Sequence, residues 1–290
     1  MAVVSCAVPS TAPDGSVPQI APIGLNGMAE ELAGQEISVW GADYLGHQLL
    51  RFDPDTGVIH ERHGGLCDTD DVVVAPGGSL LATCAGQGTV VRLSRGGRAE
   101  VLARVGRGVN PIALEPGGDA VIVGFGTEDH DELIRVPLDG APAEVVADGL
   151  PVLNGFGFGP DGRLYVPTAG VGGVLGSTGG LAVIDLATGV LTPIPMTSGG
   201  RPLGLAFAVG VDVAPDGTVF IAQGVDPAVW AVDPATGEAT PVGRSPLPYA
   251  DNLVVLSDGR VVLSGFLGER FVVFSPDVAG GWGREVGAVG

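Results

Sequence analysis

One pattern recurs six times along this chain: a polar residue, a short apolar run, a Pro-Asp-Gly-type turn and a second apolar run. The copies begin at Asn26, Asp70, Asn110, Asn154, Val209 and Asp251. In each copy a glycine lies eight residues after the first position, at Gly34, Gly78, Gly118, Gly162, Gly217 and Gly259. Proline presets the φ angle of a turn, and glycine and aspartate tolerate the left-handed backbone of tight hairpins. Each copy therefore predicts two strands joined by a tight turn.

A second turn follows further along the unit, in FDPDTGV (52–58), IDLATGV (184–190) and VDPATGE (232–238). The unit thus contains four strands, and its copies are spaced by 44, 40, 44, 55 and 42 residues. Four antiparallel strands repeated at this period are typical of propeller blades. We expect an all-β fold, a six-bladed β-propeller with four antiparallel strands per blade. It forms a single domain over residues 1–290, with blades starting near residues 26, 70, 110, 154, 209 and 251.

Three segments fall outside the regular repeat. Residues 1–25 form either an N-terminal arm or an outer strand that closes the ring, and the tail GGWGREVGAVG (280–290) suits the fourth strand of the last blade. The Gly-rich segment 170–180 lacks the Lys-Ser/Thr of a phosphate loop. We interpret it as a connection within blade four that could cover one mouth of the propeller.

Composition excludes several classes of function. The formal net charge is −19, and all 14 basic residues are arginines. Such a field repels nucleic acid and anionic membrane surfaces, and it favours metal cations and cationic or neutral ligands. No segment has the roughly 18 uninterrupted apolar residues of a membrane span. The expected partner is a small-molecule substrate, with no nucleic acid and no membrane, and the oligomeric state stays open.

The cysteines bear on the cellular compartment. Cys6, Cys67 and Cys84 are an odd number, without CxxC or Cys/His spacing. This favours reduced thiols over a disulfide framework. The N-terminal segment lacks the basic region and the long apolar stretch of a secretory signal. We therefore expect a cytoplasmic protein.

The first residue of each copy predicts where chemistry takes place. In a propeller the first strand of each blade lines the central channel, so these residues face the axis at one mouth. Five of the six are Asn or Asp, and oxygen ligands of this kind suit a hard divalent cation such as Ca²⁺. The predicted metal ligands are Asn26, Asp70, Asn110, Asn154 and Asp251. The alternative is that these side chains only cap strand starts.

Acid–base candidates lie at the same mouth. Asp70 and Asp251 are the carboxylates of the ring, and either could activate water. His130 lies in the acidic loop GTEDHDEL and is a second candidate base, because histidine titrates near neutrality; the alternative is a solvated charged loop. Asp71 and Asn252 lie one residue beyond the ring. Asp212 could supply the oxygen that Val209 lacks.

Two stretches resemble known proteins. NGFGFGPDGRLYVPTAG (154–170) and DNLVVLSDGRVVLSGF (251–266) resemble blade motifs of the gluconolactonase/regucalcin (SMP-30-like) family of six-bladed propellers. LPYADNLVVLSDG (247–259) also resembles a segment of strictosidine synthase-like and paraoxonase-like proteins. The resemblance covers the chain from about Asn26 onward. It implies a superfamily that includes lactonases, phosphotriesterases, a Pictet–Spengler synthase and binding proteins.

The resemblance also implies roles for single residues. Asn110 matches a family asparagine near substrate or metal, and Asn154 matches a metal ligand. Asn252, in the Asp251–Asn252 pair, would contact substrate. The family's fifth-blade aspartate and first-blade glutamate would fall at Val209 and Asn26, so this chain departs from the pattern there.

Three functions remain open from the sequence. The first is a metal-dependent hydrolase of a lactone or ester at the mouth of the channel. The second is a metal-free lyase, isomerase or cyclase of the strictosidine synthase or virginiamycin lyase type, in which a channel carboxylate is the acid or base. The third is a propeller that binds a small molecule or partner without catalysis.

Overall fold

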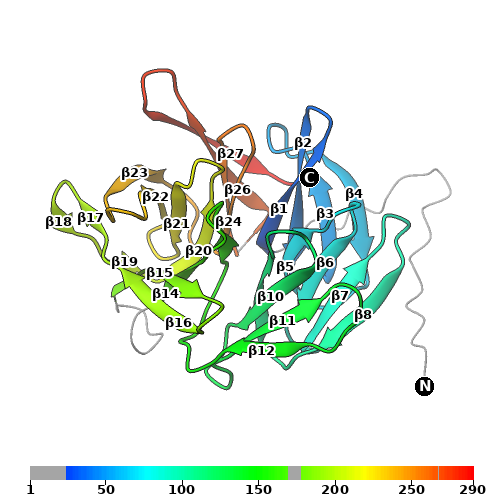
Figure 1. Ribbon diagram of the computed structural model, residues 1–290. Helices are drawn as coiled ribbons and strands as arrows, with labels where there is room; N and C mark the ends of the chain where they lie inside the picture. Colours follow the sequence, from blue (N-terminus) through cyan, green and yellow to red (C-terminus); the bar gives the residue numbers. More distant parts are fainter. Residues whose placement is uncertain (1–23, 169–177, 267) are drawn as a thin grey trace.

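The computed structural model describes residues 24–168, 178–266 and 268–290, and these form a six-bladed β-propeller (Figure 1). Each blade is a sheet of four antiparallel strands that follow one another along the chain. The expected fold class is therefore confirmed. In the described part of the chain no helix is long and apolar enough to span a membrane.

The strands of the first three blades are these. Blade 1 contains β1 (Leu25–Ala33), β2 (Glu36–Asp43), β3 (Gln48–Phe52) and β4 (Ile59–Gly64). Blade 2 contains β5 (Thr69–Val74), β6 (Leu80–Cys84), β7 (Thr89–Leu93) and β8 (Ala99–Arg104). Blade 3 contains β9 (Val109–Leu114), β10 (Ala120–Phe125), β11 (Leu133–Pro137) and β12 (Glu144–Ala147).

The other three blades follow the same order. Blade 4 contains β13 (Gly157–Phe158), β14 (Leu164–Thr168), β15 (Thr178–Asp185) and β16 (Val190–Ile194). Blade 5 contains β20 (Ala208–Val213), β21 (Val219–Gln223), β22 (Ala228–Val232) and β23 (Ala239–Arg244). Blade 6 contains β24 (Leu253–Val255), β25 (Val261–Ser264), β26 (Arg270–Pro276) and β27 (Trp282–Ala288). Between blades 4 and 5 lie the short strands β17 (Thr197–Ser198), β18 (Arg201–Pro202) and β19 (Leu205–Ala206), the last paired with β15.

The recurrent glycine forms the turn between the first two strands of every blade. In all six copies its φ angle lies between 70° and 91°, a range in which a Cβ is disfavoured. The second turn type depends on aspartate: Asp53 Oδ1 accepts hydrogen bonds from the backbone N–H groups of Asp55 and Thr56. Both turns thus join strands as the sequence predicts.

The apolar core lies between blades. Six clusters of buried side chains are present in the described residues, and each joins two neighbouring blades. One of them closes the ring between blades 1 and 6, where the rings of Phe52 and Phe271 lie 5.0 Å apart. The tail supplies β27, as expected, and this strand is the fourth of blade 6. The N-terminal arm up to residue 23, and residues 170–177 of the Gly-rich segment, lie outside the described residues.

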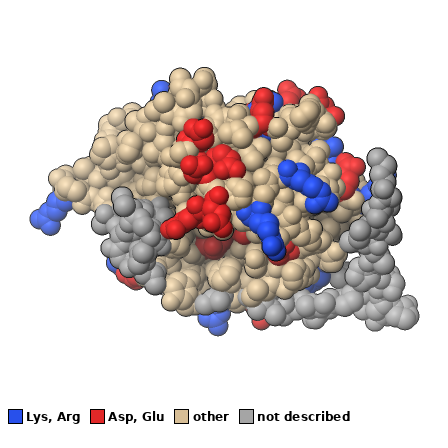
Figure 2. Space-filling model, turned by 90° about the horizontal axis from the view of Figure 1, so that it is seen from below, with Lys and Arg blue, Asp and Glu red and all other residues tan. Residues whose placement is uncertain are grey.

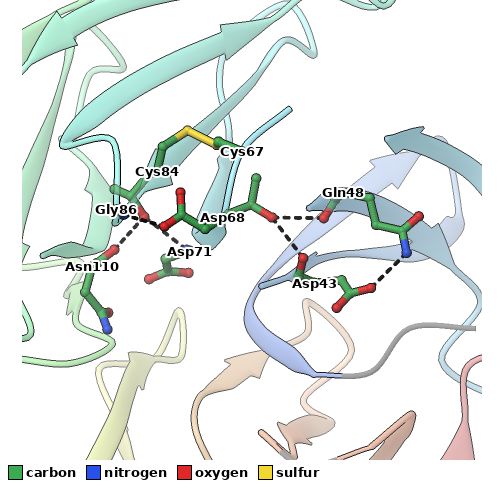
Figure 3. Close-up of a disulfide and its surroundings, with 10 residues drawn as sticks. Asp43, Gln48, Cys67, Asp68, Asp71, Cys84, Gly86 and Asn110 are labelled. Carbon is green, nitrogen blue, oxygen red and sulfur yellow. Dashed lines mark hydrogen bonds between the residues drawn. A yellow bond between two sulfur atoms is a disulfide. The ribbon is translucent and has the colours of Figure 1, made fainter. Parts of the chain in front are cut away.

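The expectation of reduced cysteines is wrong for one pair: Cys67 and Cys84 form a disulfide (Figure 3). Cys67 lies in the loop before β5 and Cys84 ends β6, and both are buried. The sequence could not show this, because a separation of 17 residues does not reveal that the loop folds back onto the end of β6. The ground for expecting a cytoplasmic protein is thereby removed, and its location stays a prediction.

Candidate functional site

The first residues of the blades meet at one end of the central channel, which we call the mouth. This end lies at the bottom of Figure 1, where the chain passes from β12 to β13. Figure 2 shows the face from below: acidic side chains gather around its centre, and basic side chains lie to one side of them. The mouth is therefore an electronegative site.

Asn26 and Asp70 lie together at the mouth, from blades 1 and 2. Asn26 Nδ2 donates to Asp70 Oδ1 over 3.0 Å, and only 3% of Asn26 is exposed. Asn26 Oδ1 is buried and has no hydrogen-bond partner among the described residues. A buried oxygen without a donor is costly. A cation or hydrogen-bond donor bound beside Asn26 Oδ1 would therefore remove this cost.

Two carboxyl groups of the mouth have raised pKa values. Burial raises the pKa of Asp251 to about 7 and the nearby Asp70 adds to the rise, whereas a hydrogen bond from the Asn154 side chain opposes it. Burial also raises the pKa of Asp70 to about 6; the hydrogen bond from Asn26 opposes this, and Asp68 adds to it. Asp251 is thus linked electrostatically to Asp70 and by hydrogen bonding to Asn154.

The remaining first positions contribute less. The Asn110 side chain lies against Gly126 in its own blade, where a Cβ on the glycine would come within 3.1 Å of Asn110 Nδ2. Val209 is buried in the core between blades 5 and 6. The oxygen-bearing part of the mouth therefore runs from Asn154 through Asp251, Asn26 and Asp70.

Asp71 and Asn252 lie one residue deeper and meet in the channel. Asn252 Nδ2 lies 3.5 Å from Asp71 Oδ2, and both residues are buried. Burial raises the pKa of Asp71 well above its usual value, against hydrogen bonds from the backbone N–H groups of Val72 and Ile112. Glycine makes room for both: a Cβ on Gly27 would lie 1.7 Å from Asp71 Oδ1, and one on Gly155 would lie 2.2 Å from Asn252 Oδ1.

Two hydroxyl groups that sequence reasoning missed hold this pair in place. Thr83 Oγ1 accepts from Asp71 N over 3.0 Å and donates to Asn110 O over 2.7 Å. Ser264 Oγ accepts from Asn252 N over 3.0 Å. Each hydroxyl lies twelve residues after the residue it binds. A comparison of equivalent positions in blades 2 and 6 could have found them.

A cavity of about 300 Å³ lies beyond the Asp71–Asn252 pair, toward the opposite end of the channel. It is lined by this pair, by Asp212 and Glu30 and by apolar side chains, and none of the first-position residues lines it. The suggestion that Asp212 replaces the missing oxygen at Val209 is therefore wrong. Its carboxylate accepts from Val213 N and Val255 N, because three residues along a strand carry it away from the mouth.

His130 is held inside its own loop. Its ring stacks on Phe125 at 4.1 Å, and its Nδ1 lies 2.8 Å from Glu132 Oε1. Its Cε1 and Nε2 face Gly106, where a Cβ would come within 2.8 Å and 3.0 Å of them. These contacts explain its position by packing, and its role as a base stays a prediction.

Asp68 is a further acidic group that sequence reasoning missed. Its Oδ2 accepts from Gly86 N (Figure 3). Its backbone carbonyl accepts from Ala85 N. Burial raises the pKa of Tyr44, and Asp68 and Asp70 raise it further. The disulfide, which ends at the residue before Asp68, anchors this edge of the mouth to β6.

The mouth fits a hard cation better than a soft one. Within the described ranges, no three His, Cys, Asp or Glu side chains gather as a metal centre. A cation would therefore depend on amide as well as carboxylate oxygens. Asn26 Oδ1, Asp70 and Asn154 carry oxygens of the type that Ca²⁺ accepts. Asp251, which is hydrogen-bonded to Asn154, is left to exchange a proton.

Comparison with solved structures supports the propeller fold. No family model and no curated protein matches the sequence. A gluconolactonase from Xanthomonas campestris superposes with a TM-score of 0.66 at 18% identity, over 85% of this chain and 84% of that one. Virginiamycin B lyase from Staphylococcus aureus gives 0.64 at 10%, over 91% and 84%. A chain of the nidogen/laminin complex gives 0.67 at 12%, over 84% and 90%. At such identities these similarities establish the shared propeller fold alone.

Proposed function

We propose that this propeller is a divalent-cation-dependent hydrolase of a lactone or ester, with its active site at the mouth. The observation that carries the proposal is the buried Asn26 Oδ1, which has no hydrogen-bond partner in the described part of the chain and lies beside Asp70. A bound cation would satisfy this oxygen. The fold shared with a gluconolactonase supports the same reaction class.

The residues of the mouth divide into a cation-binding side and a reacting side. Asn26 and Asp70 would hold the cation, joined by Asn154, and the role of Asn110 as a ligand stays a prediction. When bound, a divalent cation polarises the carbonyl group and stabilises the negative charge that develops on its oxygen. The hydrogen bond from Asn26 to Asp70 keeps that carboxylate oriented.

Asp251 is the residue best placed to move a proton. Its ionised carboxylate takes a proton from the attacking water and returns it to the leaving alkoxide. The hydrogen bond from Asn154 orients the carboxyl group. Asn252, buried against Asp71, forms the floor beneath, and its contact with substrate stays a prediction.

The test is hydrolysis of a panel of lactones and aryl esters after removal of metal and addition of Ca²⁺, Mg²⁺ or Mn²⁺. We expect activity that chelator abolishes and one cation restores. Asp70→Asn should weaken binding of the cation, whereas Asp251→Asn should lower kcat and leave the affinity for the cation unchanged. Glu285→Gln, on the exposed strand β27, is the charge-matched control.

Two results would contradict the proposal. One is hydrolysis that proceeds equally with and without chelator. The other is an Asp70→Asn variant that binds the restoring cation as tightly as the wild type. Calorimetric titration with the cation separates loss of binding from loss of catalysis.

A metal-free lyase or isomerase is the second candidate. The observation that favours it is the proximity of Asp70 and Asp251, two carboxyl groups with raised pKa values of about 6 and about 7. One could take a proton while the other gives one. Conversion of a cyclic ester to an unsaturated acid, with no oxygen from solvent in the product, would favour this candidate; incorporation of ¹⁸O from labelled water would favour hydrolysis.

A further inference from the structure

The mouth face carries two unlike surfaces on opposite sides of the axis. In a ring of six, blades 3 and 6 face each other. The loop from Thr127 to Glu132 follows β10 in blade 3, whereas Tyr249 and Phe266 flank the first and second strands of blade 6. A molecule that lies across the mouth therefore meets a different chemistry at each end.

The blade 3 side is acidic. Glu132 pairs with His130, and the carboxylates of Glu128, Asp129 and Asp131 are left exposed to solvent. The loop is also anchored, because Gly126 N donates to Gly108 O and Leu150 N donates to Asp131 O. These carboxylates belong to a fixed loop, and an anchored group of negative charges attracts cations.

The blade 6 side is apolar. Tyr249 is 46% exposed and Phe266 is 36% exposed. Tyr249 lies two residues before Asp251, and its carbonyl oxygen faces Gly265, the residue before Phe266. Large exposed side chains beside a polar site are typical of surfaces that contact the apolar part of a ligand.

At the same mouth, in blade 1, the buried Asn26 Oδ1 has no hydrogen-bond partner among the described residues. We infer that the mouth takes an ester or lactone with an ammonium group, its apolar part against Tyr249 and Phe266 and its cationic group toward Glu128 and Asp129. The inference rests on the proposed function, because the reacting carbonyl is placed at the ring of Asn and Asp. Arg107, whose Nε donates to Gly86 O, lies beside blade 2. Its positive charge could attract an anionic group, so a preference for an anionic substrate is the competing outcome.

The experiment compares two esters of phenylacetic acid that differ only in charge, the choline ester and its neutral 3,3-dimethylbutyl analogue. We expect kcat/KM for the choline ester to exceed that for the analogue by about tenfold at 50 mM salt. The ratio should fall at 500 mM salt, because ions screen exposed charges. In Glu128→Gln/Asp129→Asn the ratio should approach one. In the matched control Glu36→Gln/Glu285→Gln, with both changes away from the mouth, it should stay at the wild-type value.

The outcomes are separable. If both esters are hydrolysed at equal kcat/KM, the inference is wrong and the hydrolase stands. If Glu128→Gln/Asp129→Asn still prefers the choline ester as strongly as the wild type does, the inference is also wrong. If neither ester is hydrolysed, the proposed function fails, and calorimetry with Ca²⁺ present decides the inference: about tenfold tighter binding of the choline ester supports it, and equal or absent binding overturns it.

Discussion

Asn252 Nδ2 lies 3.5 Å from Asp71 Oδ2, although 181 residues separate the two along the chain. The contact joins blades 6 and 2 across the channel, past blade 1. It sets the floor of the mouth, and the cavity at the other end of the channel begins at the same pair. The pair thus divides one channel into two compartments.

The space for this pair depends on Gly27. A Cβ there would lie 1.7 Å from Asp71 Oδ1 and 2.6 Å from Asp71 Cα, so backbone as well as side chain must shift. We expect Gly27→Ala to lower the free energy of unfolding by about 3 kcal/mol. Urea denaturation measures this. Gly64→Ala is the control, since a Cβ there meets nothing within 4 Å; equal losses in both variants would contradict the account.

Reduction of the Cys67–Cys84 bond should weaken the fold. The bond closes a loop of 17 residues, for which chain entropy gives about 3 kcal/mol. We expect the denaturation midpoint to fall after reduction and in Cys67→Ser/Cys84→Ser. Thiol titration under denaturing conditions, before and after reductant, establishes the oxidised state. An unchanged midpoint in a protein shown to be oxidised would count against the stabilising role.

The stability contribution of Asp212 should depend on pH. Burial raises its pKa from 3.8 to about 6 in the folded protein. Between about pH 4 and pH 6 the folded protein therefore holds a proton that the unfolded chain has released, and stability falls as the pH rises through this window. The loss is at most about 3 kcal/mol and is complete above the folded pKa.

The measurement is urea unfolding from pH 4 to pH 7.5. Asp212→Asn should show a shallower decline than the wild type across the window, and Glu285→Gln should follow the wild type. Parallel curves for Asp212→Asn and wild type would show that this carboxyl group does not titrate as its burial requires.

Thr83 is predicted to matter through its hydroxyl group alone. Thr83→Val keeps the shape but leaves Asp71 N–H without an acceptor and Asn110 C=O without a donor, both provided by Thr83 Oγ1. We expect a loss of about 2 kcal/mol in the free energy of unfolding. Thr192→Val, at an exposed position of β16, should change it by less than about 0.5 kcal/mol.

The repeat was sufficient to predict the propeller because its turns depend on local chemistry. Gly78 and Gly118 adopt the positive φ that a tight turn needs, and Asp53 binds the two N–H groups that follow it. Such preferences are encoded within a few residues. Asn26 and Asp70 occupy the same position in neighbouring blades, and they are therefore close enough to form a hydrogen bond.

Contacts between distant segments could not be predicted in this way. The Asp71–Asn252 contact depends on how closely blades 2 and 6 approach across the axis, and the Cys67–Cys84 bond depends on the path of a loop. Asp212 was misplaced because its distance from the mouth depends on strand geometry that the repeat does not specify. Residue pattern gives the register of a strand, whereas the width of a channel is set by the packing of all blades together.

The way the ring closes has a mechanical consequence. Among the described residues every blade contains four consecutive strands, and no strand is shared between the first blade and the last. The junction depends on the isolated bridge between Gly24 and Gly268, on side-chain packing such as Phe52 on Phe271, and on the hydrogen bond from Gly290 N to Gly57 O. Blades 1 and 6 can therefore separate at this junction without breaking the strand pairing inside either blade. Force applied between Gly24 and Gly290 would therefore separate blade 6 from blade 1 first, while the four strands of each blade stay paired.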